Sequence, residues 1–94
     1  MIIEMKKFGV ILNSRPDGRE AALRLFQIVN GTEEKEVAID FDGVLVLTPS
    51  YADEFLTEVH KRYDGKKTIR LQNTNSASVK EALKVLEEKG KDLN

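Results

Sequence analysis

Apolar residues recur along this chain at two spacings, one typical of strands and the other typical of helices. Spacing near two, or a continuous apolar run, predicts strands at residues 8–12, 36–41 and 68–72, with a further edge strand at 2–5. Helical spacing predicts three helices, which begin near Asp17, Ser50 and Ser76 and stop near Gly31, Gly65 and Gly90. This alternation of strands and helices predicts an α/β fold.

The strand predicted at residues 36–41 is apolar at nearly every position, which is typical of a strand covered on both faces. Asp42 and Gly43 mark a turn or bend after it, and residues 44–47 are expected to continue as buried extended chain. Because Asp-Gly between apolar runs also favours a hairpin, that alternative stays open at this junction.

Strands separated by helices imply right-handed crossovers and a mostly parallel sheet. We therefore expect one domain over residues 1–90, with four or five strands and three helices, followed by a frayed tail over 91–94. The core is expected to contain Val10, Leu12, Leu25, Phe26, Val37, Ile39, Phe41, Phe55, Leu56, Val59, Ile69, Leu71, Val79 and Leu83. Sites in such folds lie at the carboxyl ends of strands, which here are residues 13–19, 40–53 and 72–78.

Composition removes several classes of function. The 94 residues include no cysteine and one histidine, His60, which leaves no thiolate chemistry and no cysteine- or histidine-rich metal site. A net charge of -1 provides no field for a polyanion, so no nucleic-acid partner is expected. Since no run approaches the roughly 20 apolar residues of a membrane span, and no signal peptide is visible, we expect a cytoplasmic protein without a membrane partner.

Asp40 and Asp42 stand two apart directly after an apolar strand. Read alone, Asp-x-Asp-Gly resembles the nucleophile motif of haloacid-dehalogenase-type phosphatases, in which one carboxylate attacks phosphorus and the other serves as acid and base around Mg²⁺. Such an enzyme also needs a downstream lysine and a further acidic cluster, whereas the acids that follow here fall on a predicted helix: Asp53, Glu54 and Glu58. Turn formation is the alternative role for both aspartates.

A second resemblance covers about residues 8–86. The residues that carry it are Arg15 to Gly18, the strand end Asp40-Phe41, the run Ser50-Tyr51-Ala52-Asp53-Glu54-Phe55 and the late Asn73. In these positions the chain resembles a bacterial family of STAS-like domains of unknown function, related in fold to STAS domains, the fold of anti-sigma-factor antagonists. The sequence departs from the STAS pattern at Thr48, Pro49 and Tyr51.

The resemblance implies a non-enzymatic protein-interaction module in bacterial signalling, without metal or cofactor. In STAS relatives, a serine at the position of Ser50 is phosphorylated by a partner kinase with a histidine-kinase-type ATP fold, and phosphorylation releases that partner. A helix start favours an anion there, because free N–H groups and the helix dipole point toward it. The partner-binding surface is expected to contain Arg15, Arg19, Asp40, Thr48, Ser50, Tyr51, Asp53 and Glu54.

Plainer roles exist for the same side chains. Ser50 with Asp53 three residues later forms a simple N-cap pair, and Asp17 with Glu20 forms another. Arg15 fits an ion pair in a solvated loop as well as an anion clamp. The small magnesium-dependent phosphatase remains the alternative to the interaction module, and the partner's identity and the oligomeric state stay open.

Overall fold

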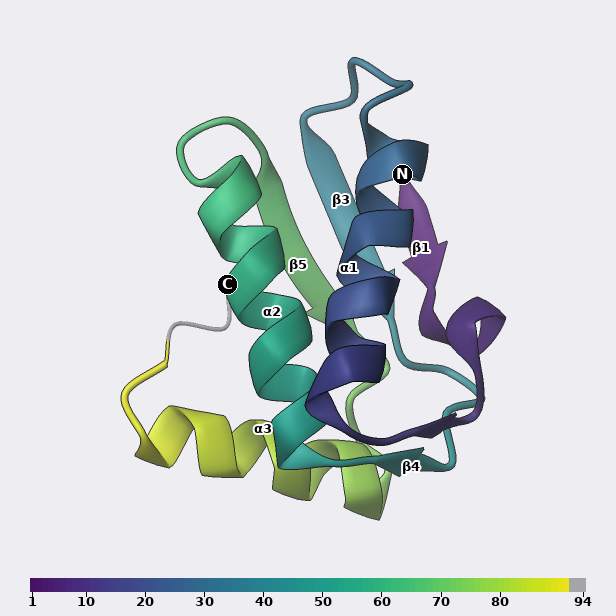
Figure 1. The fold of residues 1–94 in the computed structure, drawn as a ribbon, viewed down its shortest axis with the longest axis vertical. Helices are drawn as coiled ribbons and strands as arrows, with labels where there is room; N and C mark the ends of the chain where they lie inside the picture. The colour runs from purple at the N-terminus through teal and green to yellow at the C-terminus, as the bar shows by residue number, and fades with distance from the viewer. Residues whose placement is uncertain (92–94) are drawn as a thin grey trace.

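The computed structural model describes residues 1–91 (Figure 1). Its elements, in chain order, are β1 (Ile2–Glu4), the 3-10 helix η1 (Met5–Phe8), β2 (Ile11–Leu12), α1 (Arg15–Val29), β3 (Glu36–Asp40), β4 (Val46–Leu47), α2 (Pro49–Tyr63), β5 (Thr68–Gln72) and α3 (Ala77–Glu88). The predicted single α/β domain with three helices is confirmed.

All described strand pairs are parallel. The larger sheet has the order β1-β3-β5, with Ile3 opposite Ile39 and Ile39 opposite Leu71. The smaller sheet pairs β2 with β4, Leu12 opposite Leu47. Residues 1–91 therefore contain five strands, within the expected four or five, but they form sheets of three and two strands.

The division into two sheets follows from the conformation of the segment between β1 and β2. Met5 and Phe8, predicted at the end of one strand and the start of the next, belong instead to η1, and Gly9 follows with a φ of 134°. This φ is open to glycine and rarely adopted by other residues. The strand predicted at 8–12 shrinks to Ile11–Leu12, and Val10, predicted to be in the core, is 42% exposed.

Helices α1 and α2 lie side by side against one face of the larger sheet, and α3 runs beneath them near β4 (Figure 1). The core between them contains the remaining predicted core residues, except that Leu71 is half-buried at its margin. On β3, only Val37 and Ile39 are buried, while Ala38 and Asp40 on the other face are half-buried. The expectation that this strand is covered on both faces is therefore wrong.

The junction at residues 42–47 contains no hairpin. Gly43, with a φ of 84°, turns the chain, and β4 then pairs in parallel with β2. Of the predicted extended segment 44–47, only Val46 and Leu47 form a strand, because the N–H of Val44 donates to the carbonyl of Phe41 and closes the turn. The segment is buried only at Val44 and Leu47.

No helix within the described residues 1–91 is long and apolar enough to cross a membrane. Of the predicted frayed tail, residues 92–94 lie outside the described part of the chain. Lys91 is described, and its backbone N–H donates to the carbonyl of Leu86 at 3.0 Å.

Candidate functional site

The starts of α1 and α2 meet at a close backbone contact. Gly18 is buried in the second turn of α1, where a Cβ would lie 2.6 Å from the backbone oxygen of Tyr51. Only a residue without a side chain allows this approach. The expected partner surface is therefore built on two helix ends held in fixed register.

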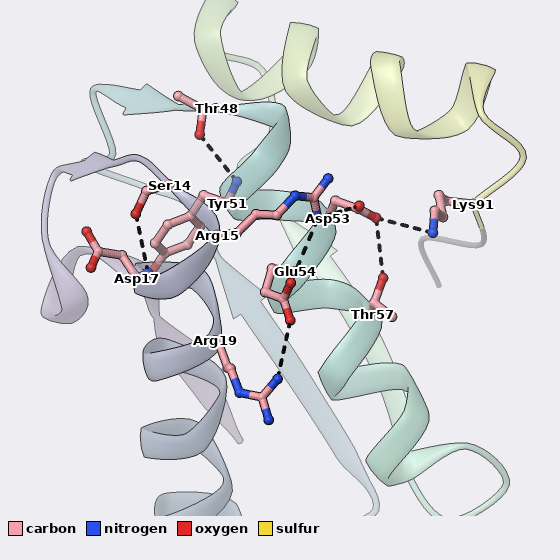
Figure 2. A network of polar contacts seen from close by, with 10 residues as sticks. All are labelled: Ser14, Arg15, Asp17, Arg19, Thr48, Tyr51, Asp53, Glu54, Thr57 and Lys91. Atoms are coloured by element: carbon pink, nitrogen blue, oxygen red, sulfur yellow. Dashed lines mark hydrogen bonds and ion pairs between the residues drawn. The ribbon is translucent and has the colours of Figure 1, made fainter.

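The side chains of the two helix starts form an ion-pair network (Figure 2). Arg15 Nη1 donates to Asp53 Oδ2 at 2.8 Å and lies 3.8 Å from Glu54 Oε1, and Arg19 Nη1 lies 4.0 Å from Glu54 Oε2. Of the two alternatives for Arg15, the structure shows the ion pair. Four predicted surface residues are thus brought together.

Asp53 is the centre of this network. Its Oδ1 accepts from the hydroxyl of Thr57 at 3.3 Å and lies 3.3 Å from Lys91 Nζ. Burial alone raises the pKa of the Asp53 carboxyl, but hydrogen bonds and charge from Arg15 and Lys91 outweigh it and hold that pKa below its usual value. Asp53 is therefore ionised at neutral pH and links α1, α2 and Lys91, which lies beyond the end of α3.

Ser50 is exposed at the second position of α2. The N-cap is Thr48, whose Oγ1 accepts from the N–H of Tyr51 at 3.3 Å, so the predicted capping pair of Ser50 with Asp53 is wrong. Pro49 at the first helical position explains the shift, because proline is favoured directly after the cap. The Ser50 hydroxyl makes no hydrogen bond to another residue within 1–91.

At α1, too, the N-cap residue lies before the residue that was predicted as the cap. Ser14 is the N-cap, and its hydroxyl accepts from the N–H of Asp17 at 3.4 Å. The predicted cap role of Asp17 is therefore wrong, and Asp17 lies inside the first turn. The last helix begins at Ser76 as predicted, and the Ser76 hydroxyl accepts from the N–H of Val79 as its N-cap. The Ser78 hydroxyl bonds the backbone of Leu47 on β4.

Tyr51 is the buried member of the predicted surface. Its side chain packs in the core, with its ring stacked on Phe55 at a centroid distance of 6.2 Å. Desolvation raises the pKa of its hydroxyl to about 12, so the group is neutral at physiological pH. Tyr51 therefore contributes to the site mainly through its backbone and its hydroxyl.

Asp40 lies at the end of β3, and its side-chain hydrogen bonds are made to residues outside the starts of α1 and α2. Its Oδ1 accepts from the N–H of Asp42 at 2.9 Å and from Asn73 Nδ2 at 2.7 Å. These two hydrogen bonds, that from Asn73 first, hold the pKa of Asp40 below its ordinary value. The structure thus shows Asp40 as a turn former bound to the end of β5.

The acidic residues do not gather as a metal centre would require. Within residues 1–91, no group of three or more His, Asp or Glu side chains is placed to hold a metal ion. Asp40 and Asp42 therefore lack the further acidic ligands that the phosphatase chemistry needs. Only the carboxylate of Asp40 is used in the turn, where it accepts from the N–H of Asp42.

Sequence reasoning missed three residues of the site. Gly18 falls just inside the helix that is predicted to begin near Asp17, and a glycine inside a helical pattern is itself a sign of close packing. The two others, Asn73 and Lys91, reach Asp40 and Asp53 from more than 30 residues away, and no local pattern marks such pairs.

A cavity of about 490 Å³ lies between α2 and α3, on the other side of Asp53. Leu56 and Leu86 form its apolar part, and His60 and Lys91 line it as well. The Nε2 atom of His60 is buried without a hydrogen-bond partner in the described structure. None of the predicted interaction residues other than Asp53 lines this cavity.

Comparison with known proteins agrees with the resemblance seen in the sequence. Residues 21–79, well over half of the chain, match the family described as STAS-like domain of unknown function (DUF4325). No curated protein and no solved structure matches the chain. The matched segment runs from α1 to the first turn of α3 and so contains Ser50, Tyr51, Asp53 and Glu54.

Proposed function

The chain belongs to the family of STAS-like domains of unknown function, and we propose that it is a non-enzymatic protein-interaction module in bacterial signalling. Its partner surface consists of the starts of α1 and α2, and phosphorylation of Ser50 by a partner kinase with an ATPase fold switches it. This function places the protein in the cytoplasm, together with its partner.

One observation carries the proposal: Ser50 is exposed at the start of α2 and does not cap the helix, because Thr48 is the N-cap. A hydroxyl used as a cap would be held by the helix, whereas this one is accessible to a kinase. The first turn of a helix also favours the added anion through its free N–H groups and its dipole.

The ion-pair network supplies the means of switching. A phosphate adds about -1.5 to -2 charges at Ser50, one helical turn from Asp53 and Glu54. These carboxylates repel it, whereas the guanidinium of Arg15, now bound to Asp53 at 2.8 Å, attracts it. Phosphorylation therefore makes Ser50 a competitor for Arg15 and rearranges the surface that the partner contacts.

The test is affinity capture of partners from the native lysate on immobilised wild-type protein, Ser50→Ala and Ser50→Asp. A fourth variant, Gln27→Glu, adds the same charge at an exposed position farther along α1 and serves as the control. We expect a protein with an ATPase fold to be retained by wild type, Ser50→Ala and Gln27→Glu, and lost on Ser50→Asp.

Equal retention on all four proteins would mean that the interaction does not depend on Ser50, and the switch would be rejected. If no ATPase-fold protein binds the wild-type protein, the proposed class of partner is wrong.

A further inference from the structure

The cavity of about 490 Å³ between α2 and α3 lies outside the proposed partner surface except at Asp53. Cavities of several hundred Å³ are the usual size of small-molecule sites. The floor of this one is apolar and belongs to the core, since Leu56 of α2 and Leu86 of α3 line it and are only 3% and 1% exposed. The apolar body of a small ligand can therefore pack against the floor.

His60 lines the cavity and carries an unpartnered nitrogen. Its Nε2 is the one buried side-chain nitrogen or oxygen within residues 1–91 that has no hydrogen-bond partner. Buried polar groups are nearly always hydrogen-bonded, and leaving one unpaired costs free energy. His60 stands one turn after Leu56 on α2, so both side chains project from the same face of the helix. A ligand on that face that bonds Nε2 would remove the cost of the unpaired nitrogen.

The imidazole ring of His60 has space beside it. Its Nε2 exposes almost no surface, so a ligand reaches this nitrogen only when the ring turns toward the cavity. The residue as a whole is half-buried, and it also borders a second cavity of about 110 Å³ near the start of β5. The space in these two cavities permits the turn.

The charges of the larger cavity favour an anion. Lys91 and Arg15 both bind the carboxylate of Asp53, at 3.3 and 2.8 Å, so two cations face one anion there (Figure 2). Lys61 also lines the cavity and forms no ion pair with another residue of 1–91. Asp64 is the single opposing acid in the lining that is not paired within those residues. A carboxylate can accept charge-assisted hydrogen bonds from an ammonium group and a hydrogen bond from an imidazole N–H.

We propose that this cavity binds a small monocarboxylic acid with an apolar body. The body packs between Leu56 and Leu86. The carboxylate accepts hydrogen bonds from the ammonium group of Lys61 and, once the ring has turned, from Nε2–H of His60. This inference goes beyond the proposed function, because it assigns a ligand site away from Ser50.

The probe is 3-phenylpropanoate, and 3-phenylpropanamide is its uncharged counterpart with the same apolar body. Each compound is titrated at neutral pH into ¹⁵N-labelled full-length protein. His60 is the only histidine among the 94 residues, so NMR observes its ring nitrogens without ambiguity. The backbone amides of Thr57 and Leu86 report on the two sides of the cavity.

Three variants accompany the wild-type protein. His60→Phe keeps an aromatic ring and removes both ring nitrogens. Lys61→Gln removes the cation from an exposed position, where substitution scarcely affects folding. Lys80→Gln removes the same charge from exposed α3 surface outside the cavity and is the matched control.

We expect 3-phenylpropanoate to bind with a dissociation constant of about 1 to 10 mM, about two- to fivefold more tightly than the amide. Binding should move the ring nitrogens of His60 and the two reporter amides. His60→Phe should weaken binding of the acid, Lys61→Gln should abolish the preference for the acid over the amide, and Lys80→Gln should change neither. Absence of saturable binding, equal binding of the two compounds, an unmoved His60 ring, or an unchanged preference in Lys61→Gln would overturn the proposal.

These results are separate from the capture test of Ser50. If 3-phenylpropanoate fails to bind while capture depends on Ser50, only the carboxylate site is rejected. If it binds as expected while capture ignores Ser50, the phosphorylation switch is rejected and the carboxylate site stands.

Discussion

Gly18 of α1 packs against the peptide oxygen of Tyr51 on α2, at a place where even a methyl group would lie 2.6 Å from that oxygen. The contact holds the two helix starts together over a separation of 33 positions in the sequence. Every residue of the ion-pair network belongs to one of these helix starts except Lys91, which follows α3 and contacts Asp53. The candidate surface therefore depends on a buried glycine.

Gly18→Ala should destabilise the protein by about 1 to 3 kcal/mol, because the new methyl group meets backbone that has no alternative rotamer. The measurement is the free energy of unfolding in urea. Gly31→Ala is the control, since a Cβ there would lie at an ordinary 3.6 Å from the nearest heavy atom. Equal stabilities of the two variants would show that the helices separate easily at Gly18.

Thr48→Ala should cost about 1 kcal/mol of unfolding free energy, because it removes the acceptor for the N–H of Tyr51. Ser50→Ala should change that free energy by less than about 0.5 kcal/mol, since the Ser50 side chain is exposed and bonds no described residue. Chemical denaturation of both variants checks the pair. A larger loss for Ser50→Ala than for Thr48→Ala would restore Ser50 as the cap and weaken its assignment as a switch.

Arg15 and Asp53 should couple weakly in a double-mutant cycle, by about 0.2 to 1 kcal/mol. The Arg15 side chain is half-exposed, so water screens the pair despite its 2.8 Å bond. The cycle uses Arg15→Gln, Asp53→Asn and the double variant, each measured by denaturation. A coupling of several kcal/mol would mean that the pair is structural, and phosphorylation at Ser50 could not draw Arg15 away.

The contribution of Asp53 to the free energy of unfolding should decrease as the pH falls. Because the pKa of Asp53 is lower in the folded protein than in the unfolded chain, its contribution is fully present above the unfolded value, near 3.9. That contribution is lost as the pH falls through the folded pKa. Thermal unfolding from pH 6 down to pH 2 should therefore show a smaller acid-induced decrease for Asp53→Asn than for the wild-type protein.

Asn73→Gly should raise the pKa of Asp40 toward its ordinary value, because the 2.7 Å bond from Asn73 Nδ2 is the largest cause of its lowering. Glycine is chosen since Asn73 has a φ of 56°, which alanine would adopt only with strain. The titration of the Asp40 carboxyl carbon by NMR measures the effect. An unchanged pKa would show that the N–H of Asp42 alone holds the carboxylate.

The sequence predicts the elements of this fold well because their amphipathic patterns are strong. Val59 and Val79 lie on buried helical faces, as their spacing indicates, and Val37 and Ile69 lie on the buried face of the sheet. The error at Val10 arose because the apolar run from Phe8 to Leu12 contains Gly9, whose backbone conformation ends η1 and lets Val10 face solvent. Such a break depends on tertiary structure and leaves the apolar pattern unchanged.

The candidate site is less visible in the sequence than the fold. The composition of the run from Ser50 to Phe55 identifies the right helix start, and Thr48-Pro49 identifies its cap once proline is placed at the first helical position. The bond of Arg15 to Asp53 joins residues 38 positions apart. It follows from how α1 packs on α2, which residue spacing alone does not specify.

The most direct test of the central claim compares two forms of the same protein. The captured partner is purified, and its affinity is measured by calorimetry for unmodified protein and for protein phosphorylated at Ser50, with the modification verified by mass spectrometry. We predict that phosphorylation weakens binding by about tenfold or more, equivalent to at least ~1.4 kcal/mol. Equal affinity of the two forms would contradict the account, because Ser50 would then lie outside the surface that controls the interaction.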